Sequence, residues 1–336
     1  MSYLLRNHIP RGTYRQIGLS LIELMVAIAV GLVLMAGLLQ VFINSSGVYR
    51  MQNDLIEMQQ NGEFAMEYIA RDVRNVGFWG CLRALGNVNN QLNTAGNTTY
   101  YGYTAEMSGL ANQAAGTVVA GTDAITIRGA TNIGQGLALQ SPYPGSLSAT
   151  VNVGAGSNVV SGNVLLISDC SVGDFFQVTG IDSSGNISHV TGSGSPGNAS
   201  ANLSKAYGAG TFLYRPYTRT YDIRPGSAAG NLPSLFVTDV TGSTELVEGV
   251  QSMVILYGED TNGDGSPDRY VRANLVGNMD NVLAVRISLL MQTLNDFLTP
   301  GGQHIPYTFN GVTTTPTDQR LRRVYTTTIL LRNRGL

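Results

Sequence analysis

The sequence predicts an α+β protein in which one long N-terminal helix packs on a large, antiparallel β-rich C-terminal domain. Residues 24–43 form an apolar run, and apolar or small residues then recur every three or four positions as far as Val76. From about residue 82, short β-prone runs alternate with Gly, Asn, Ser and Pro. One helix followed by many strands is the element order typical of an α+β fold.

The apolar run is long enough to cross a bilayer, because about 20 helical residues span the hydrocarbon core. Arg6, Arg11 and Arg15 precede it without an intervening acid. By the positive-inside rule, residues 1–18 stay in the cytoplasm and the chain after about residue 44 is exported. The alternatives are an uncleaved simple anchor and a cleaved secretory signal, although the apolar core of a secretory signal is only about 7–15 residues long.

Beyond the apolar run, the pattern predicts that the helix continues as an amphipathic segment. The spacing of its apolar face is that of an α-helix, and the face consists of Val48, Met51, Leu55, Met58, Gly62, Met66, Ile69, Val73 and Val76. The polar face is interpreted as facing solvent or a neighbouring chain, and it carries Asp54, Glu57, Glu63, Glu67, Arg71 and Asp72. Gly77 and Gly80 predict the end of the helix near residue 77. Phe78 and Trp79 are expected to pack that end onto the β-rich domain.

The remainder of the chain predicts strands joined by polar loops. Residues 89–116 are rich in Asn, Thr and Tyr and low in charge, so a long surface excursion is expected there. Residues 142–156 and 191–202 are also expected to be loops. Runs rich in β-branched and aromatic residues predict strands at 124–128, 164–168, 175–179, 211–215, 219–223, 235–238, 245–257, 269–275, 282–291 and 323–331.

The composition argues against two broad classes of function. The net charge is −2, charged residues are 12% of the chain, and Lys205 is its only lysine. Without a basic stripe, nucleic acid is not expected as a partner. The three histidines, His8, His189 and His304, lie in no nucleophile–base or zinc-binding pattern. The sequence therefore predicts that the protein is not an enzyme and has no catalytic residue.

Glu23 opens the apolar run, and an acid at membrane depth costs about 2.5–3.5 kcal/mol on insertion scales. The stretch Gly18-Leu19-Ser20-Leu21-Ile22-Glu23 resembles the class III signal of type IV pilins and type II secretion pseudopilins. The resemblance implies that a prepilin peptidase in the inner membrane cuts after Gly18 and N-methylates Leu19. It also implies that Glu23, the fifth mature residue, pairs with the N-terminal amine of an adjoining subunit.

Three further stretches, residues 71–81, 246–258 and 322–329, resemble the PilW family of minor type IV pilins, which are relatives of the J-type pseudopilin. The type IV pilin-like organisation that this implies is a cleaved cytoplasmic leader (1–18), a transmembrane and polymerisation helix (19–43), an amphipathic periplasmic helix (44–80) and a β-rich globular domain (81–336). Gln40 stands where major pilins usually have a helix-kinking proline, which favours a straighter helix and a minor component.

The resemblance implies a single-pass protein of the inner membrane, N-in with a periplasmic C-terminal domain, that later reaches the pilus tip at the cell surface. There it would join a tip or priming complex that promotes pilus assembly, and so adhesion and twitching motility. The implied partners are other minor pilins of the FimU, PilV and PilX types, the major pilin and a PilY-type adhesin. The alternatives are a J-type pseudopilin of a type II secretion system and a pilus-tip adhesin or ligand-binding module.

The only two cysteines, Cys81 and Cys170, both lie on the exported side of the apolar run. An oxidising periplasm favours a disulfide between them. The alternative is two buried free thiols.

The segment Asp260–Asp268 carries the beginning of a calcium-loop pattern. Asp260, Asn262, Asp264 and Asp268 place oxygen ligands at positions one, three, five and nine, and Gly265 at position six permits a tight turn. Val271 stands where an EF-hand has its closing glutamate, and the flanks predict strands rather than helices. Two interpretations fit: a weak Ca²⁺ site, with Ca²⁺ the only cofactor expected, or a plain Asx/Gly hairpin turn.

Overall fold

The computed structural model describes residues 18, 20–192, 194–227, 230–296 and 302–334. Its first element is the 54-residue helix α1 (Leu21–Arg74), which passes without a break through Gln40, whose side-chain amide donates to Asn44 Oδ1 at 3.1 Å. The chain divides into two compact units, Met1–Asn53 and Asp54–Leu336. The second unit therefore contains the last part of α1 together with all the strands.

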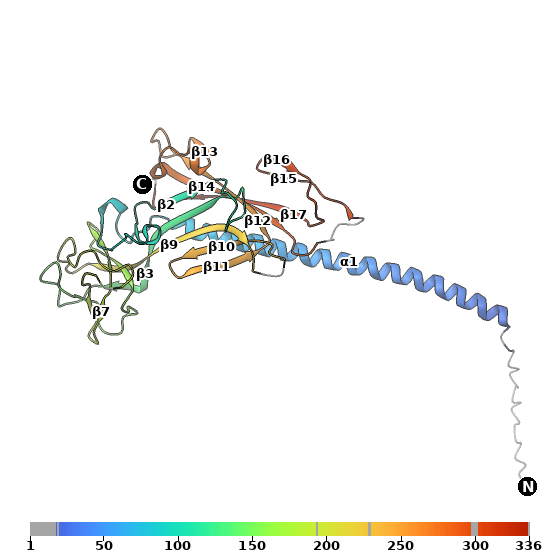
Figure 1. Ribbon diagram of the computed structural model, residues 1–336, viewed down its shortest axis with the longest axis horizontal. Helices are drawn as coiled ribbons and strands as arrows, with labels where there is room; N and C mark the ends of the chain where they lie inside the picture. Colours follow the sequence, from blue (N-terminus) through green and yellow to red (C-terminus); the bar gives the residue numbers. More distant parts are fainter. Residues whose placement is uncertain (1–17, 19, 193, 228–229, 297–301, 335–336) are drawn as a thin grey trace, which may run out of the picture. The chain divides into compact units, whose positions relative to one another are not determined.

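Two large sheets make up most of the second unit (Figure 1). The eight-stranded sheet consists of β1 (Val88–Asn90), β2 (Met107–Leu110), β3 (Ala124–Ala138), β5 (Val164–Ser168), β6 (Gly173–Gln177), β9 (Phe212–Pro225), β10 (Pro233–Asp239) and β11 (Gly242–Glu248). The four-stranded sheet has the order β13 (Arg269–Val271), β12 (Val250–Glu259), β14 (Val282–Gln292) and β17 (Arg322–Leu330).

Smaller elements complete the unit. A three-stranded sheet is formed by β4 (Val151–Asn152), β8 (Asn186–Ser188) and β7 (Gly180–Ile181), and a hairpin by β15 (Tyr307–Phe309) and β16 (Val312–Thr314). The short helix α2 (Thr98–Tyr101) and the 3₁₀ turns Leu85–Asn87, Ala273–Leu275 and Met279–Asn281 lie in connections. Among the described strand pairs, β1–β6 is parallel and the others are antiparallel. The structure is therefore the α+β, pilin-like arrangement that the sequence predicts.

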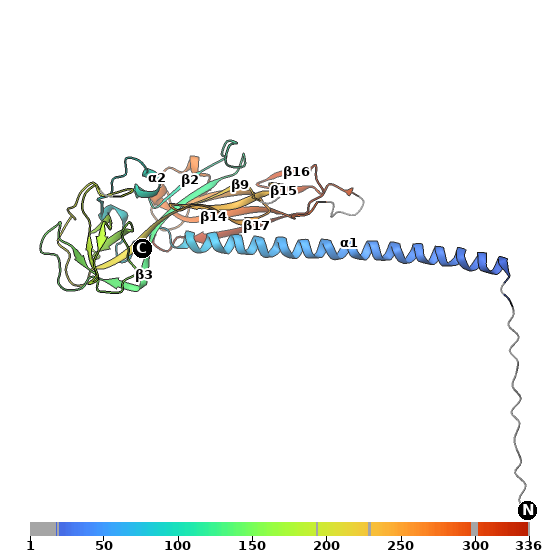
Figure 2. The same ribbon diagram turned by 60° about the horizontal axis from the view of Figure 1, so that its bottom comes forward.

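The last part of α1 belongs to the main hydrophobic core. Met58, Ala65, Ile69 and Val73 are buried in one cluster with side chains of both large sheets. Figure 2 shows α1 beside β17, and a Cβ at Gly62 would lie only 2.7 Å from the ring of Tyr325 on that strand. Glycine at this position lets the helix approach the strand closely.

Two acids of the expected polar face of α1 are buried, which corrects that expectation. Asp72 is 6% exposed, and its Oδ2 accepts hydrogen bonds from Arg219 Nη1 and from the Tyr221 hydroxyl, each at 2.6 Å. Asp54 is 8% exposed and accepts a hydrogen bond from Asn295 Nδ2 at 3.1 Å. Sequence spacing predicts an outward position for both acids because it does not reveal their polar partners, which lie on β9 for Asp72 and just after β14 for Asp54.

Several predicted strands differ from the observed ones. The expected strands at 211–215 and 219–223 are one strand, β9, and the expected strand at 245–257 is divided at Gly249, which has a φ of +81°. The expected strand at 269–275 ends at Val271 and continues as a 3₁₀ turn. Residues 89–116 are not purely a surface excursion, because they contain α2, β2 and the buried Tyr103 and Met107.

We expect Asp72→Ala to lower the free energy of unfolding by about 3 kcal/mol, because Arg219 would lose its charge partner and Tyr221 its acceptor inside the protein. The fluorescence of Trp79, the only tryptophan, reports denaturant unfolding of the full chain in detergent. Glu67→Ala on an exposed part of the same helix is the matched control and should change stability by less than about 0.5 kcal/mol. Equal effects of the two substitutions would contradict a stabilising role for the buried Asp72 carboxylate.

Candidate functional site

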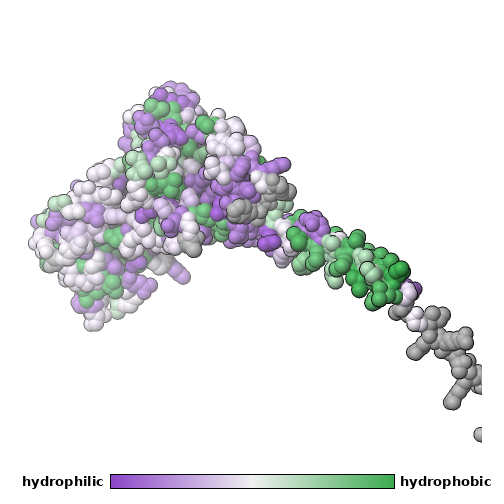
Figure 3. All heavy atoms as spheres, turned by 45° about the vertical axis from the view of Figure 1, so that its right-hand side comes forward, coloured by the Kyte–Doolittle hydropathy of each residue, from purple (hydrophilic) through white to green (hydrophobic). Residues whose placement is uncertain are grey.

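The N-terminal part of α1 is an exposed apolar belt. Among the described residues, α1 is the one helix long and apolar enough to cross a membrane, with a mean hydropathy of 2.6 over an 18-residue window of which 0% is buried in the structure. Leu21 and Ile22 are 76% and 74% exposed. Figure 3 shows apolar residues covering this part of the helix. So large an apolar surface requires lipid or other apolar helices around it.

Glu23 is exposed in the first turn of α1 and is the only charged residue between Gly18 and Tyr49. Its backbone N–H donates to Ser20 Oγ at 3.2 Å, and the N–H of Leu24 donates to Ser20 O at 3.1 Å. Ser20 therefore caps the helix, and Ser20 with Glu23 has the spacing of a capping box. This capping signal is readable from the spacing of Ser20 and Glu23, in addition to the pairing role that the resemblance implies for Glu23.

No salt bridge within the described part of the chain involves the Glu23 carboxylate. The negative charge of Glu23 is stabilised at the N-terminus of α1 by the helix dipole. Gly18, the predicted cleavage residue, is exposed, and a Cβ there would meet nothing within 4 Å. Leu19, the predicted methylation site, lies outside the described residues, as do Arg6, Arg11 and Arg15. Cleavage, methylation and subunit pairing stay predictions.

The end of α1 is joined to the β-rich unit by aromatic packing. The helix ends at Arg74, and the turn that follows reaches Gly77, whose φ is +71°. Trp79 is fully buried, donates from Nε1 to Glu106 Oε1 at 3.3 Å, and packs edge-on against Phe175 and Tyr103. The expected packing of this aromatic segment onto the domain is confirmed.

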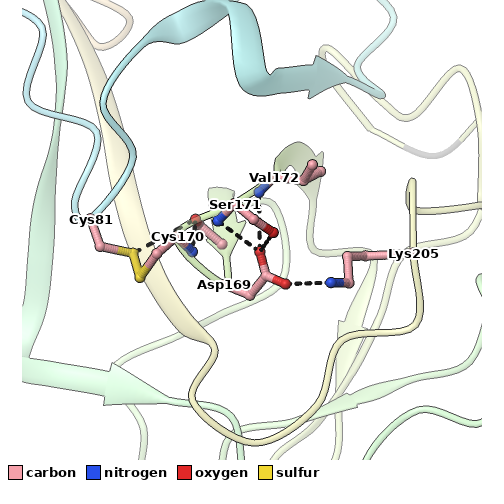
Figure 4. The surroundings of a disulfide bond; sticks show 7 residues. Cys81, Asp169, Cys170, Ser171, Val172 and Lys205 are labelled. Atoms are coloured by element: carbon pink, nitrogen blue, oxygen red, sulfur yellow. Dashed lines mark hydrogen bonds and ion pairs between the residues drawn. A yellow bond between two sulfur atoms is a disulfide. The ribbon is translucent and has the colours of Figure 1, made fainter.

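A disulfide joins Cys81 to Cys170 with their Cα atoms 4.8 Å apart, as the sequence predicts (Figure 4). Cys170 lies in the turn between β5 and β6 with a φ of +70°, and its N–H donates to Ser168 Oγ at 3.0 Å. The bridge therefore connects the segment after α1 to the β5–β6 turn of the eight-stranded sheet.

The turn that holds Cys170 is fixed by its neighbour Asp169 (Figure 4). Asp169 Oδ1 accepts hydrogen bonds from the N–H and hydroxyl of Ser171 and from the N–H of Val172, while Oδ2 pairs with Lys205. Burial opposes ionisation of Asp169, but the Lys205 ammonium and these hydrogen bonds outweigh it and hold the pKa of this carboxyl well below its usual range. The only lysine of the chain thus serves this turn.

The segment from Asp260 to Asp268 connects β12 to β13 and is closed by its own hydrogen bonds. Asp260 accepts from the N–H groups of Gly263 and Gly265 at 2.6 and 2.9 Å. The Asn262 amide nitrogen donates to Asp264 and Asp268 at 3.1 and 3.0 Å. Hydrogen bonds from Thr261 to Asp268 lower the pKa of that carboxyl.

This arrangement is that of an Asx turn rather than of a formed cation site. Within the described ranges, no three His, Cys, Asp or Glu side chains are placed to hold a metal ion. Because the Asn262 nitrogen faces two carboxylates, a bound Ca²⁺ would require this amide to turn its oxygen toward them. Yet none of the salt bridges among the described residues involves Asp260, Asp264 or Asp268, so their mutual repulsion has no cationic counterweight there. Calcium binding stays a prediction.

The two described histidines have structural surroundings. His189 is buried beside Phe176, with Nε2 2.9 Å from Ala149 O, and His304 Nδ1 is 2.9 Å from Asp318 O. Both contacts are to backbone carbonyl oxygens. Neither ring is hydrogen-bonded to a nucleophilic side chain among the described residues.

Two family descriptions match the chain. "Type IV Pilus-assembly protein W" matches residues 220–333, and "Prokaryotic N-terminal methylation motif" matches residues 14–39. The first match extends from β9 to just beyond β17, and the second includes Gly18 and Glu23. Neither the curated proteins nor the solved structures contain a significant match. Both families are structural pilin families rather than enzyme families.

For the disulfide, we expect thiol labelling of denatured, unreduced protein to be negative. Reduction should destabilise the wild-type protein by about 4–5 kcal/mol in the chain-entropy model, because the bond closes a loop with a sequence separation of 89. Thermal unfolding with and without reductant measures this difference. The matched control is Cys81→Ser with Cys170→Ser, which should not respond to reductant. Two labelled cysteines in the wild type would refute the bridge.

For the acidic turn, we expect weak calcium binding, with a dissociation constant on the order of 10⁻⁴–10⁻³ M. Calcium at ten times that constant would stabilise the protein by about 1.4 kcal/mol, a shift of a few degrees in melting temperature. Asp264→Ala should remove the shift. Asp182→Ala should retain it, because Asp182 closes another exposed Asx turn, through the N–H groups of Ser184 and Asn186. Equal melting temperatures of the wild type in calcium and in chelator would leave the plain turn as the correct interpretation.

Proposed function

Because this chain is a membrane-anchored pilin of the PilW family, we propose that it is a minor pilin that enters a tip or priming complex and promotes assembly of a type IV pilus. The observation that carries the proposal is the exposed apolar belt of α1, with one acid in its first turn. Such a belt suits two environments in turn: the bilayer before assembly, and a bundle of equivalent helices afterwards.

Glu23 gives the bundle its register. Cleavage after Gly18 creates a free amine at Leu19, and each subunit then carries one cation and one anion near the start of its helix. Pairing the Glu23 carboxylate with the amine of an adjoining subunit compensates both charges, which makes their transfer into an apolar bundle less costly. A subunit in the wrong axial position would leave both charges unpaired.

The topology follows from the same segment. The leader stays in the cytoplasm, α1 crosses the inner membrane, and the β-rich unit lies in the periplasm until the complex moves to the pilus tip. There the β-rich unit presents its loops to FimU-, PilV- and PilX-like minor pilins, the major pilin and a PilY-type adhesin. Adhesion and twitching motility depend on the pilus that this complex starts.

A J-type pseudopilin of a type II secretion system is the alternative with the same architecture. Deletion of the chain distinguishes the two: loss of surface pili with normal secretion supports the pilus, and loss of secretion with normal piliation supports the pseudopilus.

The test of Glu23 must separate its charge from helix capping. Glu23→Gln keeps a capping-box side chain but removes the charge, whereas Ser20→Ala removes the cap but keeps the charge. We expect Glu23→Gln and Glu23→Ala to reduce recovery of co-purified partner pilins and the number of pili by about tenfold or more, as loss of a charge-assisted contact predicts. Ser20→Ala should assemble nearly as well as wild type.

Membrane fractionation should show normal insertion of all three variants, and mass spectrometry should find that the mature chains begin at Leu19. The opposite pattern, in which Glu23→Gln assembles normally and Ser20→Ala fails, would assign Glu23 to capping alone. A wild-type chain that begins at another residue would exclude the proposed processing.

A further inference from the structure

A cavity of about 480 Å³ opens beside β9, within the β-rich unit. On one edge of β9, β3 pairs continuously with residues 214–221. On the other edge, β5 pairs with residues 212–214 and β10 with residues 220–225. Residues 215–219 of β9 therefore have no strand partner on that edge, and the cavity is lined by four of them, Arg215 to Thr218.

One wall of the cavity consists of Tyr100, Tyr101 and Tyr103, at and just after the end of α2. Its backbone is held from three directions. Thr218 Oγ1 donates to Tyr100 O at 3.1 Å, and Asn90 Nδ2 donates to Tyr101 O at 2.7 Å. The Asn97 side chain caps α2 by accepting from the N–H of Tyr100 at 3.2 Å. Tyr100 and Tyr101 are only partly buried, so they are presented to the cavity by a fixed backbone.

The same wall contains a strained residue. Tyr103 has a φ of +41°, in the left-handed region that costs a bulky residue about 1–3 kcal/mol. It is 6% exposed and stacks on Phe175 with a centroid distance of 4.2 Å. The stacking of Tyr103 on Phe175 thus compensates the cost of its backbone conformation, which turns the tyrosine segment toward the cavity.

The charged lining of the cavity is positive only. No Asp or Glu lines it, and its one cationic side chain is Arg215, which is exposed. Arg215 Nη2 makes only long hydrogen bonds, to Asn158 O at 3.3 Å and Asn163 Oδ1 at 3.5 Å. It has no carboxylate partner among the described residues. A guanidinium in this state is available to bind a carboxylate with two parallel hydrogen bonds.

We propose that this cavity binds an acidic saccharide, whose carboxylate pairs with Arg215 and whose ring packs against Tyr100 and Tyr101. The volume lies within the range of small-molecule sites, about 300–1,000 Å³. The electron-rich tyrosine face suits the C–H face of a pyranose, and the side chains of Asn158, Asn163 and Thr241 offer hydrogen bonds to its hydroxyl groups. An added peptide strand fits less well, because Pro216 provides no N–H on the short free edge of β9.

The test uses the full chain in lauryldimethylamine oxide, a detergent without a sugar headgroup. Saturation-transfer NMR titrations compare methyl glucuronide with methyl glucoside, which lacks the carboxylate. We expect the glucuronide to bind about tenfold more tightly, the factor that one charge-assisted contact supplies. Arg215→Ala should remove this preference, while Arg83→Ala, an exposed arginine outside the cavity, should leave it unchanged.

Tyr101→Ala should weaken binding of both sugars, and Tyr101→Phe should restore most of it, because the ring face is retained. Melting temperatures show whether each variant is folded. If a tyrosine variant is unstable, the preference of Arg215→Ala for glucuronide over glucoside still tests the proposal. Absence of glucuronide binding, binding that Arg215→Ala does not alter, or equal competition by tetraglutamate would overturn it. Pilus assembly is expected to be normal in Arg215→Ala, so this result and that of Glu23 are independent.

Discussion

The structure depends on one constraint: a single uninterrupted helix must be stable in two different surroundings. Up to about Ile43, α1 is apolar on every side and exposed. From Asp54 onward it is buried on one side only, where Met58, Ala65, Ile69 and Val73 pack with both large sheets. Because the backbone hydrogen bonds of a helix are internal, the same conformation serves in lipid and in a protein core. Only the side-chain pattern changes, from an all-round apolar surface to an apolar stripe.

The buried Asp72 sets the axial position of the second half of the helix relative to β9, which apolar packing alone does not do. Apolar packing along a stripe tolerates small shifts of a helix along its axis, whereas a buried carboxylate with two partners on β9 does not. Trp79 and the Cys81–Cys170 bridge then hold the segment that follows the helix. Force applied to α1 in a filament would thus reach the β-rich unit through a polar anchor, an aromatic cluster and a covalent bond.

Patterns local in sequence predicted the helix, its end near Gly77, the cysteine pair and strands such as β5. Features that depend on distant partners were not predictable in this way. The sequence predicts two strands, 211–215 and 219–223, where the structure has the single strand β9 with Pro216 inside it. The structure accommodates this proline where neither β5 nor β10 pairs with β9. Asp54 and Asp72 appeared to belong to a polar face because their partners are more than a hundred residues away. The capping role of Ser20 was readable from sequence and was missed.

The gap between β5 and β10 along one edge of β9 links the fold to the proposed ligand site. A proline in a central strand removes a backbone donor, so a continuous neighbouring strand there would have one unpaired carbonyl. Dividing the neighbour into β5 and β10 avoids that cost and opens the edge of β9 between them. The tyrosine segment that lines this opening is anchored by Asn90 and Thr218, whose own positions are set by the sheet. The backbone of Tyr100 and Tyr101 is therefore held by hydrogen bonds in which their own side chains take no part. The proposed assembly through α1 and the proposed ligand binding at this opening involve different residues, so a change of ligand at the opening would leave the assembly helix unaltered.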